Sequence, residues 1–186
     1  DQAAPGEHFV YGMMGDGDMM EGVQAEAVSL AGHLKLGKLV VLYDDNNITI
    51  DGATDLAFSE DVRGRFAACG WDTALVEDGT DVDAIDRALV AAKAVTDKPS
   101  LIAVRTRIGH GSPNRENTSK AHGEPVGDEE LQLTKDSLGW PAQARFHIPD
   151  PVREHFREAV TVGADAEAEW QSRWEAYAAS HPTLAD

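Results

Sequence analysis

The sequence lacks the features of a secreted, membrane-spanning or nucleic-acid-binding protein. Cys69 is the only cysteine among 186 residues, which excludes an internal disulfide framework and favours a cytoplasmic location. The longest apolar runs, such as LVVLY at residues 39–43, are too short to cross a bilayer. Basic residues number 16 against 33 acidic ones, and the formal net charge is −17. This charge argues against nucleic acids and anionic membranes as partners, because both attract basic surfaces.

The chain also lacks an initiator methionine and a signal peptide, and a strand is predicted from its eighth residue. We therefore expect it to be cut from a longer protein. Its length and its 42% apolar content are sufficient for one domain with a buried core. Because the chain is acidic, it must bind any anionic ligand by local means, such as a bound cation or backbone amides.

The apolar pattern predicts strands and helices in alternation. Strands are predicted at residues 8–14, 38–44, 71–76 and 99–106. Helices are predicted at residues 19–36 with Gly37 as the C-cap, at 61–69 and 81–95, and, after a long loop at 107–127, at 128–138, 151–160 and 166–180. In the last helix Trp170, Trp174 and Tyr177 form an aromatic stripe, which is typical of a packing face. The alternation predicts an α/β fold with a doubly wound, mostly parallel sheet and flanking helices.

The segment GDGDMMEG at residues 15–22 places an aspartate between two glycines after the first predicted strand. An EF-hand starting at Asp16 would need glycine and glutamate where the sequence has Glu21 and Ala27. A dinucleotide-binding loop would need its third glycine two residues earlier, and a P-loop would need Gly-Lys-Ser/Thr. Taken alone, the segment is as well explained by a surface turn.

A second polar segment, DNN at residues 45–47, follows the next predicted strand, and Asn46 lies thirty residues after Asp16. Successive parallel strands end at the same edge of a sheet, so both side chains can approach one point. A carboxylate and an amide oxygen suit Mg²⁺, whose other ligands are often phosphate oxygens. Gly17 would let the backbone approach a phosphate, and a helix starting near Met19 would offer free amides. The two segments together predict a Mg²⁺-bridged diphosphate.

Gly-Asp-Gly followed by Asn-Asn resembles the thiamine-diphosphate motif. The flanking sequences narrow the resemblance to transketolases, in one register from Met14 to Gly139. They are GDGDMMEGVQAEAVSLAGHLKLGKLVVLYDDNNITIDG, TDKPSLIAVRTRIGHGSPN, AHGEPVG and LGW. Dihydroxyacetone synthases, a sister group, share most of these sequences and stay an alternative.

The resemblance implies a cofactor and a metal. Asp16, the Asn46 side chain and the Ile48 carbonyl would coordinate Mg²⁺, for which Ca²⁺ or Mn²⁺ can substitute. Gly15, Gly17 and Asn46 would line the diphosphate of thiamine diphosphate.

The resemblance also implies roles for residues further away. Ile50 and Ile108 would flank the thiazolium ring with apolar surface. His122 would lie near the diphosphate and the reacting oxygen of the substrate, where an imidazole exchanges protons near neutral pH. Glu21 and Glu26 would meet a second subunit of a homodimer. Taken alone, Ile50 and Ile108 also suit a hydrophobic core, His122 suits a loop without a role, and Glu21 suits the first turn of a helix.

The parent enzyme implied by the resemblance transfers a two-carbon ketol unit between sugar phosphates in the pentose phosphate pathway. In this family the carboxylate that activates the aminopyrimidine lies in a separate pyrimidine-binding domain. We therefore expect residues 1–148 to be the later part of the diphosphate-binding domain, with a sheet incomplete at its N-terminal side. Residues 149–186 would be a helical linker, and the chain alone would be inactive. A non-catalytic cofactor-binding module, as a split subunit or a proteolytic fragment, is the other interpretation.

Overall fold

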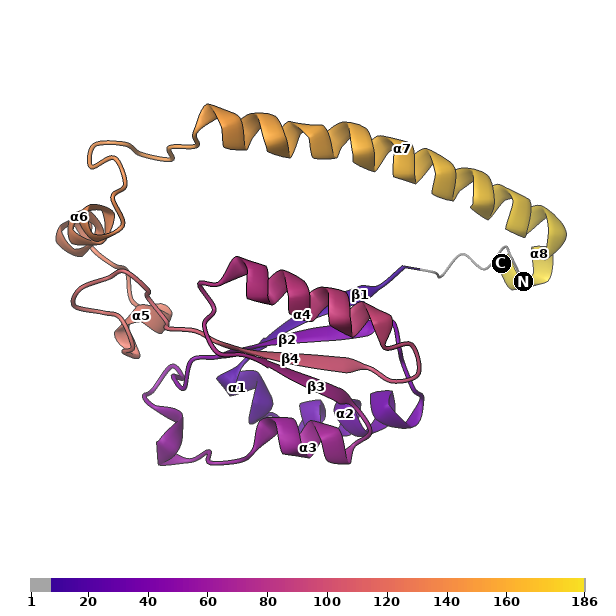
Figure 1. The fold of residues 1–186 in the computed structure, drawn as a ribbon, viewed down its shortest axis with the longest axis horizontal. Helices are drawn as coiled ribbons and strands as arrows, with labels where there is room; N and C mark the ends of the chain where they lie inside the picture. The colour runs from indigo at the N-terminus through magenta and orange to yellow at the C-terminus, as the bar shows by residue number, and fades with distance from the viewer. Residues whose placement is uncertain (1–7, 186) are drawn as a thin grey trace. The chain divides into compact units, whose positions relative to one another are not determined.

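The computed structural model describes residues 8–185, which divide into two compact units (Figure 1). The first unit, Phe9–Ala142, contains a sheet of four parallel strands in the order β1-β2-β4-β3. Its strands are β1 (Val10–Gly15), β2 (Leu39–Asp45), β3 (Asp72–Val76) and β4 (Ser100–Arg105). Its helices are α1 (Asp16–Met19), α2 (Gly22–His33), the 3₁₀ helix η1 (Thr54–Leu56), α3 (Val62–Ala68), α4 (Val82–Ala94), α5 (Lys120–Gly123) and α6 (Asp128–Ser137).

Helices cover both faces of the sheet. The connections from β1 to β2 and from β2 to β3 move in one direction across the sheet, and their helices α2 and α3 lie on one face (Figure 1). The connection from β3 to β4 steps back, and its helix α4 lies on the opposite face. A single hand for all crossovers requires this change of face. The predicted doubly wound α/β fold is confirmed.

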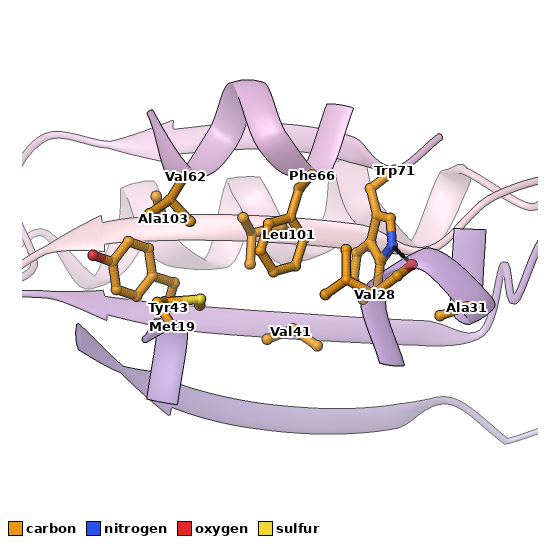
Figure 2. Packing of buried hydrophobic residues seen from close by; sticks show 10 residues of the cluster. All are labelled: Met19, Val28, Ala31, Val41, Tyr43, Val62, Phe66, Trp71, Leu101 and Ala103. Atoms are coloured by element: carbon orange, nitrogen blue, oxygen red, sulfur yellow. Dashed lines mark hydrogen bonds between the residues drawn. The ribbon is translucent and has the colours of Figure 1, made fainter. Parts of the chain in front are cut away.

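The hydrophobic core has two layers, one on each face of the sheet. Val41 and Leu101 point into the layer under α2 and α3, and their neighbours Val40 and Ile102 point into the layer under α4. Figure 2 shows the first layer, in which the Trp71 indole donates a hydrogen bond to a backbone carbonyl of α2 at 2.9 Å. Burial on both faces is why these strands have continuous rather than alternating apolar runs.

The predicted helix at residues 19–36 is wrong at both ends. α1 begins at Asp16, directly after β1, and α2 ends at His33. Glu21 takes an extended backbone (ψ 133°) between the two helices, so the predicted single helix is interrupted. The carboxylate of Asp18 explains the early start, because it accepts a hydrogen bond from the Gly15 N–H at 2.7 Å.

Gly37 does not cap α2. Lys35 takes the left-handed conformation (φ 55°) that ends the helix, and the Leu36 N–H donates to the Ala31 carbonyl across the turn. Gly37 is required by a close contact instead, because a Cβ there would lie 2.1 Å from the carbonyl oxygen of Thr96.

β1 lies at one end of the described sheet. Its residues Val10, Tyr11 and Met13 are exposed, the last at 80%. Exposed apolar side chains of this kind are what we expect of an incomplete sheet, and the incompleteness itself stays a prediction.

The second unit contains the described residues 143–185. Here the two helices predicted at 151–160 and 166–180 are one, α7 (Asp150–Ser180), followed by the short α8 (Pro182–Ala185). The predicted aromatic stripe is a row of stacked rings that runs from Trp170 through Trp174 and Tyr177 to His181, with centroids 5.0–5.9 Å apart. No helix within residues 8–185 is long and apolar enough to cross a membrane.

Candidate functional site

The parallel strands end at one edge of the sheet. Gly15 of β1 lies beside Asp44 of β2, and Asp44 lies beside Val104 of β4. A groove of about 930 Å³ opens at this edge. It is lined by residues that follow three of the strands, among them Asn46 and Ile48 after β2, Asp78 and Thr80 after β3, and Thr106 and His110 after β4. Ligands of doubly wound sheets bind at this position.

Asp16 is buried at this edge, with 3% of its surface exposed. Its Oδ1 accepts a hydrogen bond from the Tyr43 hydroxyl at 2.6 Å. Its Oδ2 accepts from the backbone N–H groups of Asn46 and Asn47, at 3.1 and 2.8 Å. A carboxylate offers about four lone-pair positions, so three are used and one, on Oδ1, is open. Asp16 therefore joins the end of β1 to the loop after β2.

The backbone of Asn47 makes this contact possible. Its φ of 62° lies in the left-handed region, which asparagine tolerates better than most residues. The turn places two successive N–H groups on one carboxylate oxygen, a common way to hold an anion. The Asn47 carbonyl in turn accepts from the Thr54 N–H at 3.0 Å, which ties the loop to η1.

The Asn46 side chain is held at both ends. Its Nδ2 donates to Asp44 Oδ2 at 3.2 Å, and its Oδ1 accepts from the Ile48 N–H at 2.9 Å. The Thr106 hydroxyl, beyond β4, donates to Asp44 Oδ1. The structure thus joins the Asp16 carboxylate to the backbone of Asn46, and the Asn46 side chain to Ile48, so the three residues predicted as metal ligands lie at two adjacent strand ends.

Negative charge gathers at this edge. Burial raises the pKa of Asp45 above its ordinary value, the nearby carboxylates of Asp16 and Asp44 raise it further, and Arg105 opposes them. Burial and the hydrogen bond to Asp16 also raise the pKa of the Tyr43 hydroxyl, which stays protonated. A bound cation would relieve the repulsion among these carboxylates.

The donors at this site are oxygens. Within residues 8–185, no group of three or more His, Cys, Asp or Glu side chains is arranged to hold a metal. One carboxylate, one side-chain amide oxygen and one backbone carbonyl need no such group, and they suit a hard cation such as Mg²⁺. The donor set at Asp16, Asn46 and Ile48 therefore fits the metal that the motif implies.

Of the predicted site residues, only Asn46 and Ile48 line the groove, and Asp16 lines a smaller cavity of about 280 Å³ with Tyr43 and Asn47. Ile50 is 68% exposed, and His122 is exposed on α5. Ile108 is half-buried, and its carbonyl accepts from a backbone N–H of the following loop at 2.9 Å. Glu21 and Glu26 are exposed at the start and on the surface of α2.

Sequence reasoning missed three residues of the site. Tyr43 belongs to an apolar run, and Asp44 and Thr106 border on the predicted loops, so none of them stood out. The period-two alternation of a strand was an available signal for Tyr43, because it places this side chain on the same face as the buried Val41.

Comparisons with known proteins identify the family of this chain. A family model described as "Transketolase, thiamine diphosphate binding domain" matches residues 1–186. The transketolase of Geobacillus stearothermophilus is 49% identical over 179 residues, which cover 96% of this chain and 27% of that protein. The transketolase of Nostoc sp. is 50% identical over 177 residues, which cover 95% and 26%.

Solved structures show the same relationship. The transketolase of Pichia stipitis in complex with sedoheptulose 7-phosphate superimposes with a TM-score of 0.90 at 38% identity, over 99% of this chain and 27% of that one. The transketolase of Leishmania mexicana gives a TM-score of 0.89 at 38% identity, over 98% and 27%. The chain therefore spans about a quarter of the length of these relatives. Sequence and fold agree, and the chain belongs to the transketolase family, within its thiamine diphosphate-binding domain.

Proposed function

We propose that this chain binds the diphosphate of thiamine diphosphate through Mg²⁺, for which Ca²⁺ or Mn²⁺ can substitute. The observation that carries the proposal is the buried Asp16 carboxylate, which three hydrogen bonds fix against β2 and the loop that follows it. Its open lone pair on Oδ1 would bind the cation. Asn46 Oδ1 and the Ile48 carbonyl would complete the protein ligands, and phosphate oxygens and water would fill the remaining positions.

The glycines beside Asp16 leave room for the diphosphate. A Cβ at Gly17 would meet no atom within 4 Å, and one at Gly15 would meet only the Asp18 carboxylate, at 3.9 Å. α1 is four residues long, so its dipole is weak and the expected contribution of a helix N-terminus is small. We infer that the cation, and not a helix, attracts the diphosphate to this acidic chain.

Other residues have proposed roles in the assembled enzyme. Ile50 and Ile108 would present apolar surface to the thiazolium ring, and the high exposure of Ile50 leaves it available for this contact. His122, which is exposed, would move a proton at the reacting oxygen of the substrate. Glu21 and Glu26 would contact a second subunit, since both are exposed on the same short stretch of chain.

We further propose that the full-length protein transfers a two-carbon ketol unit from a ketose phosphate to an aldose phosphate, as part of the pentose phosphate pathway. When bound, thiamine diphosphate supplies the covalent chemistry, and the residues of this chain bind and orient it. The names of the relatives and the sugar phosphate in the Pichia stipitis complex support this proposal. We expect a cytoplasmic homodimer in which residues 1–148 hold the diphosphate and residues 149–186 lead to a pyrimidine-binding domain. This chain alone would be inactive.

The test is a pair of substitutions at Asp16 in the full-length protein. Asp16→Asn keeps the size of the side chain and one oxygen that can accept from the Asn46 and Asn47 N–H groups, but it removes the charge. Asp16→Ala removes both the charge and the hydrogen bonds. Calorimetric titration with thiamine diphosphate in Mg²⁺ should show no measurable binding by either variant. Asp55→Ala, at an exposed aspartate in η1, is the matched control and should bind normally. Mg²⁺-dependent binding by Asp16→Asn as tight as in the parent would refute the proposal.

A further inference from the structure

We propose that Asp44 is a positioning residue for the metal site. Asp44 fixes the Asn46 side-chain amide with its oxygen on the ligand side, and Thr106 fixes Asp44. This inference rests on the proposed function, because it assigns a role toward the same cation. It adds two residues that do not themselves bind the metal.

Three side chains, in or directly after two strands, are linked by hydrogen bonds. The Thr106 hydroxyl, after β4, donates to Asp44 Oδ1, and Asp44 Oδ2 accepts from Asn46 Nδ2 at 3.2 Å. The other end of the amide, Asn46 Oδ1, accepts from the Ile48 N–H at 2.9 Å. Asp44, Asn46 and Thr106 are all at least half-buried, so water competes weakly for these hydrogen bonds.

The two partners of the amide permit a single orientation. An ionised carboxylate only accepts hydrogen bonds, and a backbone N–H only donates them. If the Asn46 amide were reversed, its oxygen would face the Asp44 carboxylate and its NH₂ group would face the Ile48 N–H. Both contacts would then be repulsive, and both hydrogen bonds would be lost. The loop therefore holds the amide oxygen on the side of Ile48, whose carbonyl is the neighbouring proposed ligand.

This orientation decides whether Asn46 can serve as a ligand. A hard cation binds the oxygen of an amide and does not bind its NH₂ group. The carboxylate also polarises the amide through the N–H it accepts, which makes the amide oxygen a better donor to a cation. Loss of Asp44 should therefore weaken metal binding about 10- to 100-fold, the usual effect of removing a group that holds a metal ligand.

Two substitutions at Asp44 separate positioning from charge. Asp44→Asn removes the negative charge but keeps an oxygen that accepts from Asn46, because the Thr106 hydroxyl can accept from the new amide as readily as it donates. Asp44→Leu removes both charge and acceptor. Mn²⁺ affinity is measured by calorimetry on the full-length protein with thiamine diphosphate present, and the Mn²⁺ EPR spectrum reports the symmetry of the bound ion.

We expect Asp44→Leu to lose about tenfold or more in Mn²⁺ affinity and Asp44→Asn to stay within about threefold of the parent. Equal losses in the two variants would overturn the proposal, since charge alone would then explain them. Unchanged Mn²⁺ affinity in both variants would also overturn the proposal. Asp44 would then only join β2 to the residue after β4. Binding by Asp16→Asn would refute the metal site itself, a result distinct from both.

Thr106→Val provides a second route if Asp44→Leu fails to fold, which thermal unfolding without metal would reveal. It keeps every charge and removes only the hydroxyl that holds Asp44. We expect a loss of about fivefold in Mn²⁺ affinity, the equivalent of one hydrogen bond, and a broadened EPR spectrum. The double variant Asp44→Asn with Thr106→Val should lose more affinity than either single variant, because its new amide has no partner at residue 106. Unchanged affinity in Thr106→Val and in this double variant would overturn the proposal that Thr106 fixes Asp44 and Asp44 fixes Asn46.

Discussion

Replacement of Tyr43 by Phe would remove one hydroxyl and leave the ring in the core layer under α3. Tyr43 is 4% exposed and Asp16 is 3% exposed, so the hydrogen bond between them is shielded from water. A hydrogen bond to a charged group contributes about 1.5–3 kcal/mol to stability. Asp16 Oδ2 keeps its two backbone partners in the variant, so the loss is confined to Oδ1. We expect Tyr43→Phe to lower the free energy of unfolding of the metal-free chain by about 1.5–3 kcal/mol.

Urea-induced unfolding at neutral pH measures this difference. Tyr11→Phe is the matched control, because Tyr11 lies on the neighbouring strand β1 and is 51% exposed. The control should change the free energy of unfolding by no more than about 0.5 kcal/mol. If Tyr43→Phe were no less stable than Tyr11→Phe, the hydroxyl would not be the group that holds Asp16 in place.

The hydrogen bond between Tyr43 and Asp16 should also make the stability of the chain depend on pH in the alkaline range. The pKa of Tyr43 in the folded chain is raised above its ordinary value of 10.0, first by burial and then by Asp16. The folded state therefore keeps its proton where the unfolded state releases it. The stability that depends on this proton is complete below pH 10.0 and is lost as the pH rises above that value. The difference in stability between the parent and Tyr43→Phe should shrink above pH 10.0, and a constant difference would contradict the assigned pKa shift.

Three further substitutions test other parts of the chain. Gly37→Ala should destabilise the chain by more than about 2 kcal/mol in thermal unfolding, because its Cβ would lie 2.1 Å from a backbone carbonyl. Gly163→Ala, in α7 where a Cβ meets nothing within 4 Å, should instead stabilise it by about 0.5–1 kcal/mol. The pKa of Glu130 is lowered by hydrogen bonds from Ser112 and Asn114, so its stabilisation is present above its ordinary pKa of 4.5 and is lost as the pH falls below it. Acid unfolding of Glu130→Gln, followed by circular dichroism, should therefore be less steep below pH 4.5 than that of the parent.

The sequence was a sufficient basis for the fold class and for the strands, but not for the order of the strands. Apolar runs indicate which segments are buried on both faces, and β2 and β4 are such runs. They carry no signal that β4 inserts between β2 and β3, because that placement depends on which helix covers which face. Helix ends were missed where side chains other than the expected caps act, as at Asp18, which starts α1 early, and at Lys35, which takes the left-handed turn after α2.

Residues 43–47 lie at the end of β2 and just after it. They show why the proposed metal ligands were easier to predict than the residues that hold them in place. Side chains on a strand alternate between faces, so Tyr43 points to the layer under α3, where it reaches Asp16, and Asp44 points to the other face, where it meets Thr106. Beyond the strand the backbone turns, and the N–H groups of Asn46 and Asn47 reach Asp16 while the Asn46 side chain reaches back to Asp44. A ligand residue is recognisable by its type and its spacing in the chain. A residue that holds a ligand is defined by its neighbours in space. Two of those neighbours, Asp16 and Thr106, directly follow β1 and β4, which the sequence separates from β2 by an entire helix or more.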